Sequence, residues 1–453
     1  MKKIISCFMA VLLCMLSLSF AVIAEEPAAE TFDVNIVLEW DDFRDKYSNR
    51  PSEVNVSLFR ADETGENPEC ICSFVLSDEN NWVYTVTELS KEYSALYYVE
   101  VESLDAYDSR VTRGCSPEDV LAVASEEIGY FEKASMFAID DKTANTGTND
   151  YTKYARDMYE YYPRWYIGNK NGYGWCDVFA DWCFIKTFGY RNALDLLCQP
   201  ERSAGAICRC SLDYFNQKGQ FHTEDPRPGD QVFFGTSLTN VSHVEIVERA
   251  DDDYIYTIGG NCSDRVKSIK RRISTAGIIG YGRPDYESFS NTFTIIETLK
   301  TERLCVSRDW RDNDNVDNTR PESVNTALLR DGEQVDTLDI IADYEWFYAW
   351  YNLPCYVGGV EVQYDIFAED IDGYYTECIF GDDLYNFTHI LNSLRGDFNG
   401  DGIITIEDAS ALLNAILFGG WLNQNGDLNG DNTVSIEDAT YLLNCILFGN
   451  SIL

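Results

Sequence analysis

The chain has 453 residues, of which 76 are Asp or Glu and 35 are Lys or Arg, so its formal net charge is −41. This charge excludes nucleic-acid binding through a basic face, because such binding depends on cations that neutralise phosphates. The composition is globular, with 45% hydrophobic and 14% aromatic residues, and at roughly 150 residues per domain the length indicates about three domains.

Residues 1–24 (MKKIISCFMAVLLCMLSLSFAVIA) combine two lysines, an apolar run and small residues at Val22 and Ala24. This order is typical of a secretory signal peptide, so we expect a secreted, extracellular protein. No later stretch reaches the roughly 18 apolar residues of a membrane span, so we expect none. Cys7 and Cys14 leave with the signal, and the 13 remaining cysteines include at least one unpaired thiol.

Residues 32–113 contain alternating apolar segments between polar turns, such as VNVSLF (54–59) and WVYTV (82–86). This alternation predicts a small β-sandwich. A second copy is predicted at 292–393, because eight residues of the first recur 270 positions later. They are Trp40, Asp42, Arg50, Pro51, Val54, Asn55, Leu58 and Arg60, which return as Trp310, Asp312, Arg320, Pro321, Val324, Asn325, Leu328 and Arg330.

The W-x-D and R-P-x-x-V strings of both copies, with the aromatic strands NWVY (81–84) and WFY (346–348), resemble Cna B-type domains. The resemblance implies sandwich domains that act as spacers or bind a ligand. In many such domains a Lys two residues before the Trp forms an intramolecular isopeptide bond. Leu38 and Arg308 stand at that position here, so we expect no such bond in either copy.

The segment between the two copies, 115–286, has a different pattern. A helix start is predicted at SPED (116–119), and an apolar stripe from Trp175 to Ile185 predicts a second helix that ends at Gly189. Cys176 therefore lies at a helix N-terminus. There the helix dipole and the free backbone N–H groups favour a thiolate and can bind an oxyanion.

His243 opens an alternating strand, SHVEIVERA (242–250), which turns at 251–253 into YIYTIGGN (254–261). A turn centred on Asp252 places Asn261 opposite His243, where the amide oxygen could accept a hydrogen bond from the imidazole. Cys176, His243 and Asn261 would then be nucleophile, general base and orienting residue. A register slip of two residues would break this pairing.

The strings GWCDxFxxWC (174–183), PGDxVFF (228–234), SHVxIV (242–247), GN (260–261) and IxGYGRP (278–284) together resemble the CHAP family of cysteine, histidine-dependent amidohydrolases and peptidases. The resemblance implies a papain-like α+β catalytic domain at 115–286. It also implies the roles already given to Cys176, His243 and Asn261, a thioester acyl-enzyme, and no cofactor for catalysis. Many members carry Glu where this chain has Gly259, which leaves a nearby acid such as Asp264 open as third member.

For the substrate, the same resemblance implies peptidoglycan, cleaved either between N-acetylmuramic acid and L-alanine or within a peptide cross-link. Two alternatives stay open. The domain could be a cysteine peptidase that acts on proteins of a plant cell wall or of a competitor's surface. The chain could also be a non-catalytic adhesion or scaffold component.

A close repeat occupies the C-terminal segment 394–453, where residues 396–419 return as 426–449 with 16 of 24 positions identical. Oxygen donors at loop positions 1, 3, 5, 9 and 12, with the carbonyl at position 7, predict one calcium ion in each copy. The ligands are Asp397, Asn399, Asp401, Ile403, Thr405 and Asp408, and then Asp427, Asn429, Asp431, Thr433, Ser435 and Asp438. An ordinary EF-hand fits less well, because both twelfth positions are Asp rather than Glu.

These two loops, each followed by an apolar helical stripe, resemble a dockerin, a small α-helical calcium-binding module that plugs enzymes into cohesin modules of a scaffold, as in cellulosomes. In that family, loop positions 10 and 11 and the following helix contact the cohesin. The matching residues here are Ile406, Glu407, Leu413 and Asn414, and Ile436, Glu437, Leu443 and Asn444. The two sets are identical, which implies that either repeat could face the cohesin of a scaffold-bound complex.

Overall fold

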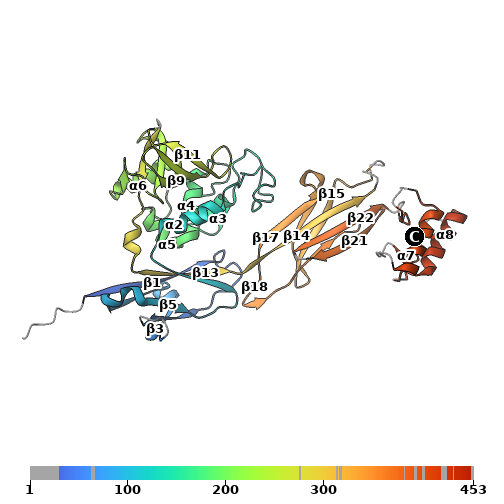
Figure 1. Cartoon of the computed structure of the whole chain (residues 1–453), viewed down its shortest axis with the longest axis horizontal. Coiled ribbons are helices and arrows are strands. Elements are labelled where there is room, and N and C mark those ends of the chain that lie inside the picture. The colour runs from blue at the N-terminus through green and yellow to red at the C-terminus, as the bar shows by residue number, and fades with distance from the viewer. Residues whose placement is uncertain are drawn as a thin grey trace, which may run out of the picture.

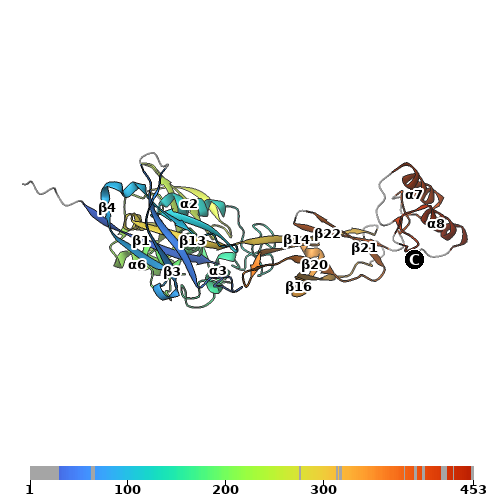
Figure 2. The same cartoon turned by 90° about the horizontal axis from the view of Figure 1, so that it is seen from below.

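The computed structural model describes residues 30–62, 67–274, 277–312, 315, 319–381, 383–391, 395–399, 403–419, 426–431 and 433–449. The predicted signal peptide and the predicted calcium ligand Asp401 lie outside these ranges. The described residues form an elongated molecule (Figure 1, Figure 2). A β-sandwich and the α+β central domain lie at one end, a second sandwich follows, and a pair of helices lies at the other end. The predicted multidomain fold class is confirmed.

The first sandwich packs a four-stranded sheet of order β4-β1-β13-β6 against a three-stranded sheet of order β3-β2-β5. Alternate residues of the strands point inward, and Val34, Ile36, Val54 and Val56 are almost fully buried in the core. The strands are β1 (Thr31–Asp41), β2 (Glu53–Arg60), β3 (Glu69–Ser77), β4 (Val83–Ser90), β5 (Tyr97–Val101), β6 (Tyr107–Arg113) and β13 (Thr292–Leu299).

The last strand of this sandwich comes from beyond the central domain. β13 pairs in parallel with β1 and antiparallel with β6, where Phe293 lies opposite Arg113. Our predicted boundary, which gave 292–299 to the second sandwich, is therefore wrong. The central domain is an insertion between β6 and β13, and both of its ends leave the same sheet from neighbouring strands.

The second sandwich repeats this topology, with sheets of order β17-β14-β22-β21 and β16-β15-β20. Here the strands that correspond to β6 and β13 form a simple hairpin, β21–β22, in which Gly381 lies opposite Leu384. The central domain thus occupies the place of one hairpin turn. The strands are β14 (Thr301–Arg311), β15 (Ser323–Arg330), β16 (Glu333–Ile341), β17 (Phe347–Pro354), β20 (Tyr364–Ala368), β21 (Tyr374–Gly381) and β22 (Leu384–Leu391), with a small hairpin of β18 (Tyr356–Val357) and β19 (Val360–Glu361).

The recurring residues of the two copies build the same polar cluster in each sandwich. In the first, both Arg50 Nε and Nη2 donate to the buried Asp42 (2.6 and 2.5 Å), and Tyr107 donates to the same carboxylate. In the second, Arg320, Asp312 and Tyr374 make the corresponding hydrogen bonds. In each copy the guanidinium also lies over the indole of the W-x-D motif. The repeat in the sequence therefore marks a shared structural element.

The two copies differ at the position where many Cna B-type domains carry Lys. Leu38 lies in the apolar core of the first sandwich. Arg308 in the second is only 3% exposed, donates to Thr326 and lies 3.0 Å from Nε2 of the buried His389. Burial, followed by the charge of Arg308, lowers the pKa of His389 to about 4.

The central domain packs helices against one antiparallel sheet of order β11-β10-β9-β8-β12-β7. Its long helix α4 (Cys176–Phe188) is buried along almost its whole length and packs on β9 and β10. The other helices are α2 (Pro117–Glu126), α3 (Lys153–Glu160), α5 (Tyr190–Leu196) and α6 (Cys208–Gln217). The strands are β7 (Phe221–His222), β8 (Gln231–Ser237), β9 (Asn240–Ala250), β10 (Tyr254–Gly259), β11 (Lys267–Arg272) and β12 (Ile278–Gly282).

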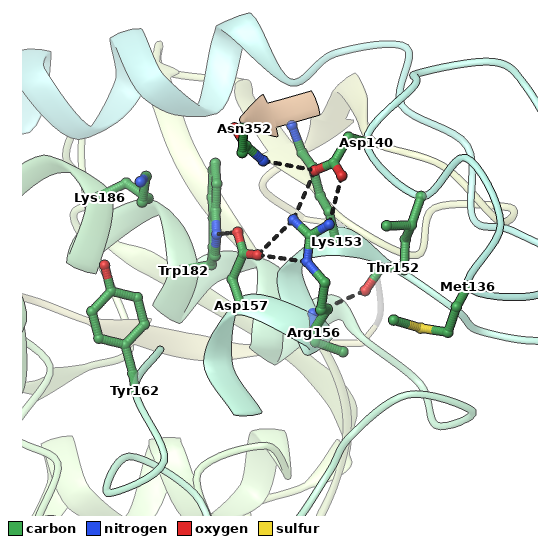
Figure 3. A network of polar contacts seen from close by, with 12 residues as sticks. Met136, Asp140, Thr152, Lys153, Arg156, Asp157, Tyr162, Trp182, Lys186 and Asn352 are labelled. Atoms are coloured by element: carbon green, nitrogen blue, oxygen red, sulfur yellow. Dashed lines mark hydrogen bonds and ion pairs between the residues drawn. The ribbon is translucent and has the colours of Figure 1, made fainter. Parts of the chain in front are cut away.

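Polar side chains join the central domain to the second sandwich. Arg156 of α3 forms ion pairs with Asp140 and Asp157, and Asp157 accepts a hydrogen bond from Trp182 of α4 (Figure 3). On the other side of Asp140, Asn352 of β17 donates to the same carboxylate at 3.5 Å. The helix under the candidate site is thus connected through α3 to the neighbouring sandwich.

The C-terminal unit consists of two copies of loop and helix, α7 (Ile406–Phe418) and α8 (Ile436–Phe448), which pack through Leu412, Leu428 and Leu442. Each helix begins with a capping box, from Thr405 and Asp408 and from Ser435 and Asp438. No helix among the described residues is long and apolar enough to cross a membrane.

Candidate active site

Cys176 is the first residue of α4, as the apolar periodicity predicts. The preceding Trp175 is fully buried, and its indole donates a hydrogen bond to Glu132 at 2.8 Å. This buried hydrogen bond fixes the position of the turn before the helix. The first backbone N–H groups of an α-helix have no acceptor within the helix, and Cys176 lies at this end of α4, where the helix dipole is positive. Cys176 itself is 8% exposed and therefore almost fully buried.

The imidazole of His243 on β9 lies close enough to the thiol of Cys176 for each group to shift the pKa of the other. A hydrogen bond from Cys208 has the largest effect in lowering the pKa of Cys176 well below its usual range, against the effect of burial, and His243 lowers it further. Burial by itself would lower the pKa of His243, but its interactions with Cys176, Cys262 and Glu245 outweigh burial and raise the pKa to about 12. The pair is therefore a thiolate beside an imidazolium, the reactive form of a cysteine nucleophile.

Glu245, two residues along β9, lies behind the imidazole. Its Oε1 is 3.1 Å from His243 Nε2, and its carboxylate also accepts hydrogen bonds from Arg271 and Thr257. Although Glu245 is fully buried, these donors lower its pKa to about 2. A buried carboxylate on the far nitrogen fixes the tautomer and the orientation of the imidazole.

Our prediction that Asn261 orients His243 is not what the structure shows. The predicted register is present near the site, where Ile258 pairs with Ile246, but β10 ends at Gly259. Asn261 then adopts a left-handed conformation (φ 53°) and donates to Asp150 at 3.3 Å. Among the described residues, the side chains that hydrogen-bond to His243 are those of Glu245 and Cys262.

Gly259 explains the departure from the family pattern. A Cβ atom built at Gly259 would lie 2.5 Å from Cγ of Glu245 and 3.1 Å from Sγ of Cys262. The space in which many CHAP members place a Glu of this strand is thus filled from the neighbouring strand. The signal for Glu245 was present in the sequence, because residues i and i+2 of a strand share one face.

Two further thiols border the site, and the sequence did not single them out. Sγ of Cys208, the first residue of α6, is 3.5 Å from Sγ of Cys176. Sγ of Cys262 is 3.4 Å from Nε2 of His243. Cys176, Cys208 and Cys262 are all free thiols in the structure.

The ligand atoms of His243, Glu245 and Cys262 lie within 4.8 Å of one another, a donor set that zinc accepts. However, the Glu245 carboxylate is already neutralised by Arg271 on both of its oxygens. A cation there would have to replace or adjoin the guanidinium, so this cluster fits the orientation of His243 better than it fits a resident metal.

In the C-terminal unit, the two loops fold alike around their last predicted ligand. Asp438 is fully buried and accepts backbone N–H groups of Leu428, Asn429 and Ser435 at 2.8 to 3.2 Å. Asp408 accepts those of Phe398, Asn399 and Thr405 in the same way. In the second loop, Asp427 and Asn429 also accept the N–H of Asp431, which gathers three oxygen-bearing side chains at one point. This all-oxygen donor set fits calcium.

The predicted cohesin contacts lie on the outer faces of this unit. Ile406 and Ile436 begin the two helices and are 55% and 53% exposed, and Glu407 and Glu437 beside them are exposed as well. One turn or more further on, Leu413 and Leu443 are half-exposed, next to Asn414 and Asn444. The two sets occupy equivalent positions of the two copies.

Comparison with protein families confirms all three resemblances. The family model of the CHAP domain matches residues 168–261. The Cna protein B-type domain matches residues 34–119 and 304–393, and the dockerin type I domain matches residues 395–447. The chain therefore carries a CHAP domain flanked by Cna B-type segments and followed by a dockerin. The CHAP match supports an amidase or peptidase activity, and dockerins of type I bind calcium and imply a cohesin partner.

Among curated proteins, the collagen adhesin of Staphylococcus aureus is 24% identical over 381 residues, which cover 76% of this chain. The match spans only 30% of the length of that adhesin. Among solved structures, a single B repeat unit of the collagen-binding surface protein of S. aureus is 13% identical and covers 80% of this chain and 99% of its own, with a TM-score of 0.20. The pilus adhesin SpaC from Lactobacillus rhamnosus GG is 10% identical and covers 80% of this chain and 43% of its own, with a TM-score of 0.15.

Proposed function

We propose that the central domain is a cysteine hydrolase that cleaves an amide bond of peptidoglycan, and that the dockerin attaches this secreted enzyme to a cohesin-bearing scaffold. The observation that carries the proposal is the pairing of Cys176 with His243, which shift each other's pKa, and the carboxylate oxygen of Glu245 at 3.1 Å from Nε2 of the imidazole. The site thus combines a nucleophile, a proton donor and an orienting group.

In the proposed reaction, the thiolate of Cys176 attacks the carbonyl carbon of the amide. The oxyanion that forms is stabilised by the backbone N–H groups at the start of α4. Nε2 of His243 is hydrogen-bonded to Glu245. In the proposed reaction Nδ1 is therefore the nitrogen that interacts with the thiolate of Cys176 and donates its proton to the leaving amine. The C–N bond breaks and a thioester remains on Cys176.

The second half of the reaction uses the same groups. His243, now neutral, removes a proton from a water molecule, and the resulting hydroxide attacks the thioester. The acid product leaves and the thiolate–imidazolium pair is restored. Glu245 stays ionised throughout, because its three donors keep its pKa at about 2. No cofactor is needed in these steps.

The assignment of the substrate rests on the CHAP match and on the extracellular character of the matched domains. Two exposed apolar side chains are close to the two thiols of the site in the sequence. Tyr173 precedes Cys176 by three residues and is 66% exposed, and Ile207 directly precedes Cys208 and is 57% exposed. We propose that these exposed side chains contact the peptide stem of the substrate.

The test compares the mature chain with its Cys176→Ala variant on purified peptidoglycan, with mass spectrometry of the soluble fragments. We expect fragments from the wild type alone, and their new termini separate an N-acetylmuramoyl-L-alanine amidase from an endopeptidase. Release of fragments by neither protein, although Cys176 is alkylated rapidly by iodoacetamide, would point to the peptidase alternative with protein substrates. An unreactive Cys176 would leave the adhesion role, which the match to the collagen adhesin favours.

Docking is proposed to use either repeat of the dockerin, because the exposed residues of α7 and α8 are equivalent. The test measures binding to a type I cohesin for Ile406→Asp, for Ile436→Asp and for the double variant. We expect each single variant to bind like the wild type and the double variant to lose binding. Loss in one single variant only would show that a single face docks.

A further inference from the structure

The two sulfur atoms of Cys176 and Cys208 are nearly in contact. Sγ of one lies 3.5 Å from Sγ of the other, and the two residues are only 8% and 6% exposed. Each is the first residue of its helix, α4 or α6, so the N-terminal ends of two helices meet at the pair. The sulfur–sulfur distance in a disulfide is about 2.05 Å, so the gap that separates the pair from a bond is within reach of side-chain rotation.

The fold fixes the two helices next to each other. One residue beyond Cys176, the carboxyl group of Asp177 forms a 2.7 Å hydrogen bond with the hydroxyl of Ser211, which lies one turn beyond Cys208. Both Asp177 and Ser211 are fully buried, and Ser211 also lies 3.0 Å from the carbonyl of Gly205. The approach of the two thiols is thus set by packed helices and a buried hydrogen bond rather than by a mobile loop.

We propose that Cys176 and Cys208 are a redox pair that reacts with low-molecular-mass disulfides and closes reversibly into an internal disulfide. The inference rests on the proposed function in one respect, namely that Cys176 is the reactive thiol of the domain. It goes beyond that function because it assigns Cys208 a task of its own and makes the hydrolase dependent on the redox state of its surroundings.

The exchange needs no component other than the small disulfide, R–S–S–R. The thiolate of Cys176 attacks one sulfur, the S–S bond of the reagent breaks, and R–S⁻ leaves and takes a proton from the imidazolium of His243. The sulfur of Cys208 then attacks Sγ of Cys176 and breaks the mixed disulfide, and the proton of Cys208 goes to the second R–S⁻. The two thiols are oxidised by two electrons, and the reagent is reduced to two molecules of R–SH.

The order of attack follows from the environment of the two sulfurs. The hydrogen bond between them lowers the pKa of Cys176 and raises that of Cys208, so the thiolate resides on Cys176. Once Cys176 carries the adduct, Cys208 is already at its side and resolves it. The closed form has no free nucleophile, so the hydrolase is active in reducing surroundings and inactive in oxidising ones.

The experiment treats the reduced mature chain with excess hydroxyethyl disulfide, blocks the remaining thiols with iodoacetamide and maps the peptides by mass spectrometry. We expect a peptide pair joined through Cys176 and Cys208, and an accompanying loss of hydrolysis that dithiothreitol restores. In Cys208→Ser we expect Cys176 to keep the hydroxyethylthio group, because the resolving sulfur is gone. Cys210→Ser is the matched control, since it removes another thiol of α6 and should cross-link like the wild type.

The outcomes separate this inference from the proposed function. A wild type that keeps the adduct on Cys176 and has an alkylated Cys208 would overturn the redox pair and leave the reactive nucleophile standing. A Cys176 that takes up no adduct in wild type or Cys208→Ser would overturn both. Linkage of Cys176 to another cysteine would contradict the role of Cys208.

Discussion

Leu38 of β1 pairs with Ile295 of β13, although the whole central domain lies between these two strands in the chain. The inserted domain leaves after Arg113 and returns at Thr292, next to Phe293, which pairs with Arg113 across the sheet. Because both ends emerge side by side, a folded domain can occupy the place of a hairpin turn without distorting the sandwich.

The first prediction concerns this insertion. A fragment that ends at residue 290 lacks β13, which is hydrogen-bonded on both sides by β1 and β6. We expect its first sandwich to unfold, because the buried side chains of β1 lose their neighbours, β1 becomes an edge strand and β6 loses the strand with which it is paired. A fragment that ends at residue 300 should keep the sandwich folded. Limited proteolysis followed by mass spectrometry checks this, and equal protease resistance of residues 30–113 in both fragments would contradict it.

The second prediction separates Glu245 from Asn261 as the residue that orients the catalytic imidazole. Glu245→Gln is expected to lower kcat/KM by roughly 100-fold or more, because the imidazolium loses the carboxylate on its far nitrogen. Asn261→Ala is expected to lower it by less than about 10-fold, since its side chain reaches Asp150 instead. Steady-state rates on a soluble muropeptide, with thermal melts as a control for folding, decide between them. A larger loss for Asn261→Ala would restore our original assignment.

The third prediction is a broad pH–rate profile. Activity needs the Cys176 thiolate and the His243 imidazolium together, so it rises with pH through the lowered pKa of Cys176 and falls only as pH approaches the pKa of His243, about 12. We expect kcat/KM to be flat across neutral pH. In Glu245→Gln the alkaline limb should move to lower pH, because the carboxylate that stabilises the imidazolium is gone. An unmoved alkaline limb would show that Glu245 has no electrostatic influence on His243.

How far the sequence predicted the site can be judged from its three catalytic candidates. Cys176 and His243 followed from local patterns, a helix start and an alternating strand, and the structure places them at the start of α4 and on β9. The strand register was also predicted correctly near the site, since Ile258 lies opposite Ile246. The error at Asn261 arose because register arithmetic assumes that a strand continues, whereas β10 stops at Gly259 and the chain turns into a left-handed conformation.

The contacts that the sequence did not predict are those between distant segments. The contact between Cys208 and Cys176 depends on how α6 packs beside α4. The pairing of β13 with β1 joins two strands that are separated in the chain by the whole inserted domain. Neither leaves a periodic signal in the sequence, because the residues concerned are apolar or small and would suit many alternative neighbours.

The fourth prediction is an acid-sensitive second sandwich. The pKa of His389 is about 4 in the folded chain, below its ordinary value of 6.5, because the imidazole is buried beside Arg308. The neutral imidazole therefore contributes stability that is complete above pH 6.5 and is lost as pH falls towards 4. Hydrogen exchange of β22 should accelerate over this interval, and His389→Gln should reduce that acceleration. An acceleration of equal size in His389→Gln would contradict the role of His389.

The last prediction concerns calcium in the dockerin. Asp408 and Asp438 are buried carboxylates that each accept three backbone N–H groups of their own loop, at 2.7 to 3.2 Å. A calcium ion at the loop oxygens would share these carboxylates and offset the mutual repulsion of the remaining acidic side chains, so metal binding and folding of this unit should be coupled. We expect chelation with EGTA to lower the melting temperature of the dockerin and to abolish cohesin binding, with recovery on addition of calcium but not of magnesium.

Asp438→Asn should weaken calcium binding at one loop by about 10-fold or more, and Asp408→Asn should do the same at the other, because a carboxylate ligand is replaced by a neutral amide. Isothermal titration calorimetry of both variants measures the two sites separately. Unchanged helicity and cohesin binding after chelation would show that the loops are held by their own hydrogen bonds alone.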